Sequence, residues 1–348
     1  MTNELKSLGR YQIQGVLGKG AMGLVYDGLD PRLARRVAIK TILTSALDDA
    51  TAKHYAMRFK REVRAVARLN HPNIVQVYDY GTQDELAYIV MEYIDGKELK
   101  DSFDAGERFP LKAVLRMMVE LLDALELAHE AGIVHRDVKP ANVMIDAAGR
   151  VKLTDFGVAR ITDPDADLGE ATRAGTLIGT PSYMSPEQIQ GQPIDRRSDL
   201  FSAGILFYQL LTGKKPFEGA QWALAKKIVQ DDPVWPSALV EVGPEIDRVV
   251  ARALAKDPAH RYPTARAFAN ALRRIAQGKP PEDPEETVPL PSESLGPRKG
   301  SEAELEFWNE VKDSDDPEDV RLYIEQFPRG EFVEQARRKI AELSRKDG

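Results

Sequence analysis

Short runs of β-branched and aromatic residues, separated by glycines, occupy most of the chain between positions 11 and 93. The runs are YQIQGVLG, GLVYDGL, RRVAIKTI, IVQVYDYG and AYIVMEY. Runs of this kind predict an antiparallel sheet. One segment, 53–69, differs, because Phe59, Val63 and Val66 recur at helical spacing and predict a helix packed on that sheet.

From position 95 onwards, apolar residues recur every three or four positions over longer segments. The predicted helices cover 111–130, 197–211, 221–230, 245–255 and 264–275. The fold class is therefore α+β, with a sheet-rich first part and a mostly helical second part. The segment 132–187 is longer than an ordinary connection, so we expect the chemistry to lie there.

The last seventy residues predict a linker followed by a small helical module. Residues 278–300 contain six prolines and little that can build a core, which is typical of a semi-extended linker. Residues 301–345 carry three apolar stripes at helical spacing, formed by Leu305, Trp308 and Val311, by Val320, Tyr323, Ile324 and Phe327, and by Phe332, Ala336, Ile340 and Leu343. A self-association or partner-binding module and a passive bundle of two to three helices both agree with this pattern.

Composition narrows the class of protein. The 348 residues are 43% hydrophobic and 30% charged, which is within the globular range. The net charge of -7 disfavours binding to nucleic acid or an anionic membrane through bulk charge. Cysteine is absent, which excludes disulfides, thiolate metal sites and a cysteine nucleophile. With no signal-peptide pattern and no apolar stretch long enough to span a bilayer, we expect a cytoplasmic protein.

Gly18, Gly20 and Gly23 lie in the turn GKGAMGLV between two predicted strands. Without side chains at these positions, backbone amides can approach a phosphate chain closely. An ordinary glycine hairpin is the simpler interpretation of this motif alone. A dinucleotide-binding fold is disfavoured, because a strand follows the glycines where that fold requires a helix.

Lys40 lies within an apolar strand pattern and Glu62 lies on the predicted helix. Taken singly, each is more simply a solvated strand or helix residue. A half-buried lysine is tolerated when it is paired, however, and Glu62 is a candidate partner for Lys40.

Three polar residues in 132–187 point to phosphate and metal chemistry. Asp137 and Asn142 are separated by Pro140, which excludes a continuous helix and allows both side chains to converge from a loop. An ionised carboxylate such as that of Asp137 can accept a proton from a hydroxyl. Asp155 and the Asn142 amide offer hard oxygen ligands, which favour Mg²⁺. Each motif alone could be a charged turn.

Taken together and in this order, the glycine turn, the strand lysine, HRDVKPAN and DFG resemble the bacterial Hanks-type (eukaryotic-like) serine/threonine protein kinases. The resemblance covers 9–276 and implies a bilobal protein-kinase fold. Its N-lobe, 9–93, is an antiparallel sheet with one helix, and its C-lobe, 95–276, is mostly helical. The linker 278–300 and the helical module 301–345 follow as an appendage.

The resemblance also implies an ATP site with Mg²⁺, or Mn²⁺ as an alternative. The residues that cover the nucleotide and enclose its adenine are Leu17, Gly18, Lys19, Gly20, Gly23, Val25, Ala38 and Met144. Met91 is the gatekeeper, and Glu92 and Ile94 offer backbone groups to the adenine edge.

By the same resemblance, Lys40 holds the α- and β-phosphates and pairs with Glu62, and Lys139 steadies the γ-phosphate. Asn142 and Asp155 bind the metal, and Asp137 receives the substrate hydroxyl.

Structural and regulatory roles are implied as well. Asp199 braces the catalytic loop, Arg261 pairs with Glu187, and Thr180 contacts Asp137 and Lys139. Arg136, Arg160 and Arg173 suit a dianion, and we expect autophosphorylation of Thr172, Thr176 or both to activate the enzyme, although both could be plain loop hydroxyls. Ser185 stands where the family usually has alanine, and we expect little effect from this change.

The predicted function is ATP-dependent phosphorylation of serine and threonine hydroxyls in protein substrates, with no nucleic acid and no membrane as partner. A scaffold that binds nucleotide without turnover is an alternative from another class. A small-molecule kinase is a third, and the long segment 158–187, which suits a peptide substrate, argues against it.

Overall fold

The computed structural model divides into two compact units, residues 1–286 and 287–348. In the first unit it describes residues 5–20, 23–43, 59–83, 86–156 and 181–281. In the second unit it describes residues 308, 309, 311, 312, 314, 320, 323, 324 and 332–346.

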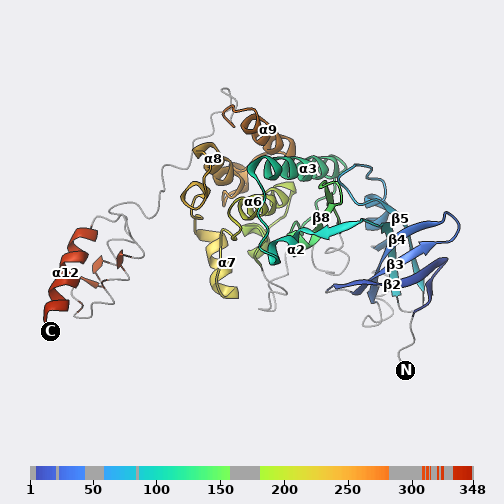
Figure 1. Ribbon diagram of the computed structural model, residues 1–348, viewed down its shortest axis with the longest axis horizontal. Coiled ribbons are helices and arrows are strands. Elements are labelled where there is room, and N and C mark those ends of the chain that lie inside the picture. The colour runs from blue at the N-terminus through green and yellow to red at the C-terminus, as the bar shows by residue number, and fades with distance from the viewer. Residues whose placement is uncertain are drawn as a thin grey trace. The chain divides into compact units, whose positions relative to one another are not determined.

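An antiparallel sheet forms the first part of the larger unit (Figure 1). Its strands are β1 (Ser7–Leu8), β2 (Tyr11–Gly20), β3 (Gly23–Asp30), β4 (Arg35–Leu43), β5 (Val77–Gln83) and β6 (Leu86–Glu92), in the order β1-β2-β3-β4-β6-β5. Residues 59–66 are helical, and their apolar residues Phe59 and Val63 pack with the sheet residues Ile42 and Ile89. The predicted sheet with one helix is confirmed, with the segment 53–58 of that helix outside the described residues.

The second part contains a small sheet of three short strands. Its strands are β7 (Gly96–Glu98), β8 (Val143–Asp146) and β9 (Val151–Leu153), and Met144 pairs with both Glu98 and Lys152. Strands of three or four residues are too short to show a clear alternation of apolar and polar positions.

Helices make up the rest of this part, in agreement with the predicted fold class. The longer ones are α3 (Leu111–Glu130), α6 (Arg196–Thr212), α7 (Gln221–Gln230), α8 (Pro244–Ala253) and α9 (Ala265–Ala276), all within two residues of the predicted bounds. The short helices α2 (Leu99–Asp104) and α5 (Pro186–Ile189) and the 3₁₀ turns η1 (Pro140–Asn142), η2 (Pro236–Ala238) and η3 (Pro258–His260) were not predicted.

Helix α6 is buried along nearly its whole length. Its side chains share one hydrophobic core with those of α3, α8 and α9, which lie above it in the view of Figure 1. A helix that is apolar on all sides requires such a position, and it gives the loops that contact α6 a rigid support.

The smaller unit contains α12 (Val333–Lys346) and a hydrophobic cluster around it. All the described members of the three predicted stripes belong to this cluster: Trp308, Val311, Val320, Tyr323, Ile324, Phe332, Ala336, Ile340 and Leu343. Leu305 and Phe327 lie outside the described residues, and the division into linker and module stays a prediction. In the described part of the chain, no helix combines the length and apolarity that a bilayer crossing requires.

Candidate functional site

The glycine turn joins β2 to β3, with Gly20 opposite Gly23 in the register. Gly23 has φ +155°, and a Cβ added there would lie 2.0 Å from the Thr41 carbonyl oxygen, so a side chain is excluded. At Gly18 an added Cβ would meet nothing within 4 Å. The backbone at Gly18 is therefore accessible to a ligand, whereas the backbone at Gly23 packs closely against β4.

Beneath this hairpin, an apolar cluster joins the two sheets. Ala38, Val75, Met91 and Ile94 are buried together, and Val25 and Met144 pack on them. Four of these residues lie on β3, β4, β6 and β8, and Val75 and Ile94 lie in the connections next to β5 and β6, so the cluster brings distant parts of the sequence to one place. The cluster contains five of the residues implied to contact adenine, and it has the apolar character that a flat aromatic ring requires.

Glu92 and Ile94 lie where β6 ends and the chain turns toward β7. The Glu92 carboxylate accepts two hydrogen bonds from Lys152 Nζ, at 2.8 and 2.9 Å, and its amide donates to the Gln76 carbonyl. Both the side chain and the backbone of Glu92 therefore fix the position of this segment. Leu17, on β2, is 44% exposed despite its apolar side chain.

Lys40, on β4, lies at the junction of the two parts of the larger unit. Its Nζ donates to Asp155 Oδ2 at 2.7 Å, and both side chains are mostly buried. Asp155 follows β9 in the left-handed conformation, with φ +65°. Glu62 is half-buried in the helical segment 59–66, next to the buried Val63. The pairing of Lys40 with Glu62 stays a prediction.

Asp137 lies in the connection from α3 to η1, within reach of two other predicted site residues. Lys139 Nζ lies 2.7 Å from Asp137 Oδ2, and Asn142 Nδ2 donates to the same carboxylate at 2.9 Å. Asn142 Nδ2 also donates to the Asp137 carbonyl oxygen at 2.8 Å. The carboxylate is about 38% exposed, so it is positioned from within the protein and still accessible to a substrate.

The backbone of this loop is fixed by Asp199 of α6. Asp199 Oδ2 accepts from the amide of His135 at 2.8 Å, and Oδ1 accepts from the amide of Arg136 at 2.7 Å. Arg136 has φ +67°, a conformation that is unfavourable for a long side chain and needs such support. A buried carboxylate on the most buried helix thus holds the loop that presents Asp137.

A second buried contact lies below the loop. Arg261 donates to both oxygens of Glu187, at 2.6 and 2.8 Å, with side-chain exposures of 0% and 4%. Burial alone would raise the pKa of Glu187, but the hydrogen bonds and charge of Arg261 and the Ser198 hydroxyl outweigh it and hold that pKa below its ordinary value.

Ser185 has a role that the sequence interpretation missed. It is the N-cap of α5, where its amide donates to Gln188 Oε1 at 2.9 Å and its hydroxyl accepts from the Gln188 amide at 3.4 Å. Gln188 Nε2 donates in turn to the Arg136 carbonyl. The signal was present in the sequence as a Ser-x-x-Gln capping box.

A divalent metal fits the donor set formed by Asn142 and Asp155. Because Asn142 Nδ2 faces Asp137, its amide oxygen is left to act as a ligand, and Asp155 brings a carboxylate. These are oxygen donors of the kind that Mg²⁺ prefers.

Other residues near the site were not predicted. His135 is fully buried, and its Nε2 donates to the Thr154 carbonyl at 2.8 Å, which joins the loop of Asp137 to the strand end that carries Asp155. Val75 belongs to the apolar cluster. Burial, followed by the charges of Asp101 and Asp155, raises the pKa of Glu98 on β7.

Arg160, Thr172, Arg173, Thr176 and Thr180 lie outside the described residues.

Comparisons with known proteins agree on one family. The family model described as protein kinase domain matches residues 11–272. The chain is 43% identical over 279 residues to the probable serine/threonine-protein kinase SCO3848 of Streptomyces coelicolor, which covers 78% of this chain and 41% of that protein.

Two further relatives show the same level of identity. The serine/threonine-protein kinase PknB of Mycobacterium tuberculosis is 42% identical over 282 residues, which cover 79% of this chain and 44% of PknB. The serine/threonine-protein kinase PksC of Streptomyces coelicolor is 42% identical over 286 residues, 78% of this chain and 50% of PksC. The chain thus spans half or less of the length of these relatives.

Proposed function

This chain belongs to the protein kinase family, and from that premise we propose that it transfers the γ-phosphate of ATP to serine and threonine hydroxyls of proteins. The observation that carries the proposal is the approach of Lys40 to Asp155 beside the Asp137, Lys139 and Asn142 cluster. The names of the relatives support serine and threonine as the phosphorylated residues.

The proposed chemistry follows from these positions. The hydroxyl oxygen of the substrate forms a bond to the γ-phosphorus, the bond from that phosphorus to the leaving ADP oxygen breaks, and Asp137 accepts the hydroxyl proton. Lys139, which already lies against Asp137, would stabilise the negative charge on the transferred group. Lys40 would hold the α- and β-phosphates from the opposite side.

Asn142 and Asp155 are the residues that would hold Mg²⁺, which neutralises charge on the phosphate oxygens when bound. The fixed Asp199 contacts keep Asp137 in place for in-line attack, so positioning rather than covalent catalysis accounts for the rate. The adenine would lie in the apolar cluster of Ala38, Val75 and Met91.

Activation by phosphorylation of Thr172, Thr176 or both is part of the proposal. Arg136 supports it, because its Nη1 is buried and has no hydrogen-bond partner in the part of the chain that the structure describes. A phosphate adds about -1.5 to -2 charge and three acceptors, which such a guanidinium can bind. If mass spectrometry of active protein finds both threonines unmodified, activation by their phosphorylation is refuted.

Radiolabel transfer to a generic basic protein or to the chain itself tests the proposed function. We expect transfer by the wild type and its loss in Asp137→Asn and Lys40→Met; equal activity in all three would refute the proposal. ATP binding without transfer in the presence of Mg²⁺ or Mn²⁺ would instead favour a nucleotide-binding scaffold.

The C-terminal unit is proposed to mediate self-association or partner binding, on the basis of its separate hydrophobic cluster. Removal of residues 287–348 would test this role, and unchanged assembly and partner capture would favour a passive bundle. Cytoplasmic localisation stays a prediction.

A further inference from the structure

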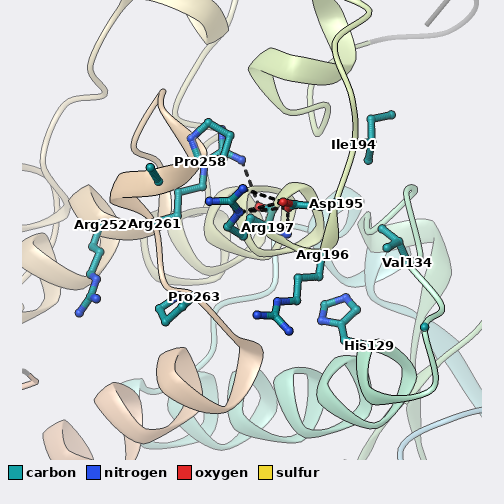
Figure 2. A pocket seen from close by; sticks show the side chains of 12 residues that line it. His129, Val134, Ile194, Asp195, Arg196, Arg197, Arg252, Pro258, Arg261 and Pro263 are labelled. Atoms are coloured by element: carbon teal, nitrogen blue, oxygen red, sulfur yellow. Dashed lines mark hydrogen bonds and ion pairs between the residues drawn. The ribbon is translucent and has the colours of Figure 1, made fainter. Parts of the chain in front are cut away.

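A pocket lined by arginines opens on the helical part of the larger unit. Its volume is about 680 Å³, and it lies between the end of α3, the start of α6 and the segment around η3 (Figure 2). Its charged lining consists of His129, Asp195, Arg196, Arg197, Arg252 and Arg261. Four arginines thus share the lining with a single carboxylate.

Three of these guanidinium groups have partners, and one of them, that of Arg252, lies over the Tyr262 ring with its Cζ 4.5 Å from the ring centroid. Arg197 is paired with Asp195 at 2.7 Å, and Arg261 is paired with Glu187. Arg196 is exposed at the first position of α6 and has no hydrogen bond or ion pair among the described residues. Arg196 and Arg197 both lower the pKa of Asp195 by their charge, so the two arginines share one carboxylate. The pocket lining therefore carries more positive than negative charge.

His129 supplies an independent sign that a ligand binds in this pocket. Its side chain is 2% exposed, and its Nδ1 is buried with no hydrogen-bond partner among the described residues, although the ring lines the pocket. The other ring nitrogen, Nε2, donates to Asp199 Oδ2 at 2.7 Å. A buried nitrogen without a partner is unfavourable, and a bound polar group would satisfy it.

A phosphate group fits these donors better than a single carboxylate does. Its three terminal oxygens can accept bidentate hydrogen bonds from Arg196 and a further bond at the ring of His129. Nδ1 of a neutral ring accepts from a protonated phosphate oxygen, and Nδ1 of a charged ring donates to an ionised one. The volume also leaves room for the molecule that carries the phosphate.

The same histidine connects the pocket to the catalytic loop. Asp199, which receives the His129 hydrogen bond, is the residue that holds the amides of His135 and Arg136. The pocket wall also includes Val134, the residue just before His135. Asp199 alone therefore connects His129 to the loop that presents Asp137.

We infer that this pocket binds a phosphate group carried by an organic molecule, such as a phosphothreonine, and that His129 and Asp199 transmit its occupancy to the catalytic loop. The claim that the pocket binds phosphate is independent of catalysis. The claim that its occupancy is transmitted to the catalytic loop rests on the proposed function. Binding is therefore tested in a chain that cannot transfer phosphate.

The binding test uses ¹⁵N-histidine NMR of the 348-residue Asp137→Asn chain, which contains five histidines, in the absence of nucleotide. The probes are phosphothreonine, inorganic phosphate and, as a negative control, threonine. We expect a saturable shift of the His129 Nδ1 signal with phosphothreonine. Arg196→Gln should weaken binding about tenfold or more, because its charge-assisted hydrogen bonds are lost.

Arg248→Gln, which removes another exposed arginine from α8 outside the pocket, should leave binding unchanged. No saturable shift with either phosphate probe, or equal affinity in Arg196→Gln and the parent, would overturn the site. Equal affinity for phosphothreonine and inorganic phosphate would overturn the role of the organic carrier.

Transmission is tested by phosphate transfer in chains with an intact Asp137. Phosphothreonine should change kcat of the wild type, and Arg196→Gln should abolish that response without changing its basal kcat. A response of equal size in both chains would overturn the transmission. Absence of transfer under every condition would refute the proposed function and leave the NMR result standing.

Discussion

Lys40 Nζ lies 2.7 Å from Asp155 Oδ2, although 115 positions separate the two residues. The lysine belongs to the third long strand of the first sheet, and the aspartate follows the last strand of the second sheet. The contact therefore joins the two parts of the larger unit at one polar point, next to the apolar cluster that contains Ala38 and Met91.

Loss of either member of this pair should strongly reduce phosphate transfer. We expect Lys40→Met and Asp155→Asn each to lower kcat by roughly 10²-fold or more, because each removes a charge that would face the phosphates. The double variant should be little worse than either single one, since the two groups act as a unit.

Lys97→Met is the matched control, because it removes a lysine from an exposed ion pair with Glu107. It should keep wild-type kcat. Full additivity of the two losses, or equal loss in the control, would contradict a joint role for Lys40 and Asp155.

The long helices and strands could be predicted from the sequence, because their apolar residues repeat at a regular spacing over many positions. Helix α3, from Leu111 to Glu130, and helix α7 begin and end at their predicted residues. The five strands of the main sheet that were predicted are present for the same reason, since each has seven or more residues. Segments as short as β7 and α5 carry too few positions to reveal a period.

The site was predictable only in part, because its contacts join segments far apart in the chain. The resemblance identified Asp199 and Arg261, but the link from His129 to Asp199 spans 70 positions and leaves no local pattern. Val75 was missed for the same reason, since it looks like any other apolar strand residue until it packs against Met91. Ser185 did carry a local signal, the capping box.

Ala38→Val should weaken ATP binding. Ala38 is 8% exposed and packs with Val75 and Met91, so two added methyl groups would fill space that the adenine ring needs. Overpacking of this size costs about 1 to 3 kcal/mol, which predicts a rise in KM for ATP of roughly 5- to 150-fold.

Ala87→Val is the control, because Ala87 is also buried in the same sheet, at 1% exposed, but belongs to a different cluster. Steady-state kinetics and thermal unfolding of both variants separate binding from stability. If Ala87→Val raises KM as much as Ala38→Val, the cluster around Ala38 is not the adenine site.

Glu187→Gln should strongly destabilise the protein. The substitution leaves the Arg261 guanidinium buried without its counter-charge, and breaking a buried pair in this way costs about 3 to 5 kcal/mol of unfolding free energy. Glu126→Gln, which disrupts the more exposed contact with Arg266, should cost at most about 1 kcal/mol. Urea unfolding measures the unfolding free energy of both variants. Similar decreases in the two would show that burial of the Arg261 pair contributes little to stability.

The same pair predicts a pH dependence. The pKa of Glu187 is lowered in the folded chain, so its stabilising contribution is fully present above the unfolded-state value of about 4.3 and is lost as pH falls through the folded value. The difference in unfolding free energy between wild type and Glu187→Gln should be constant from neutral pH to about 5 and shrink below about 4. Other carboxylates titrate in both chains and cancel in this difference, so a gap that widens toward acid pH would contradict the assignment.

Ser185→Ala should destabilise the protein by about 1 kcal/mol, the usual cost of removing a serine N-cap. The serine hydroxyl accepts from the Gln188 amide, and Gln188 in turn donates to the Arg136 carbonyl, so the cap also orders the loop next to Asp137. Ser185→Thr keeps the capping oxygen and is the conservative control. Urea unfolding should rank wild type and Ser185→Thr together above Ser185→Ala. If the alanine variant matches the wild type, the serine contributes nothing beyond the alanine typical of the family.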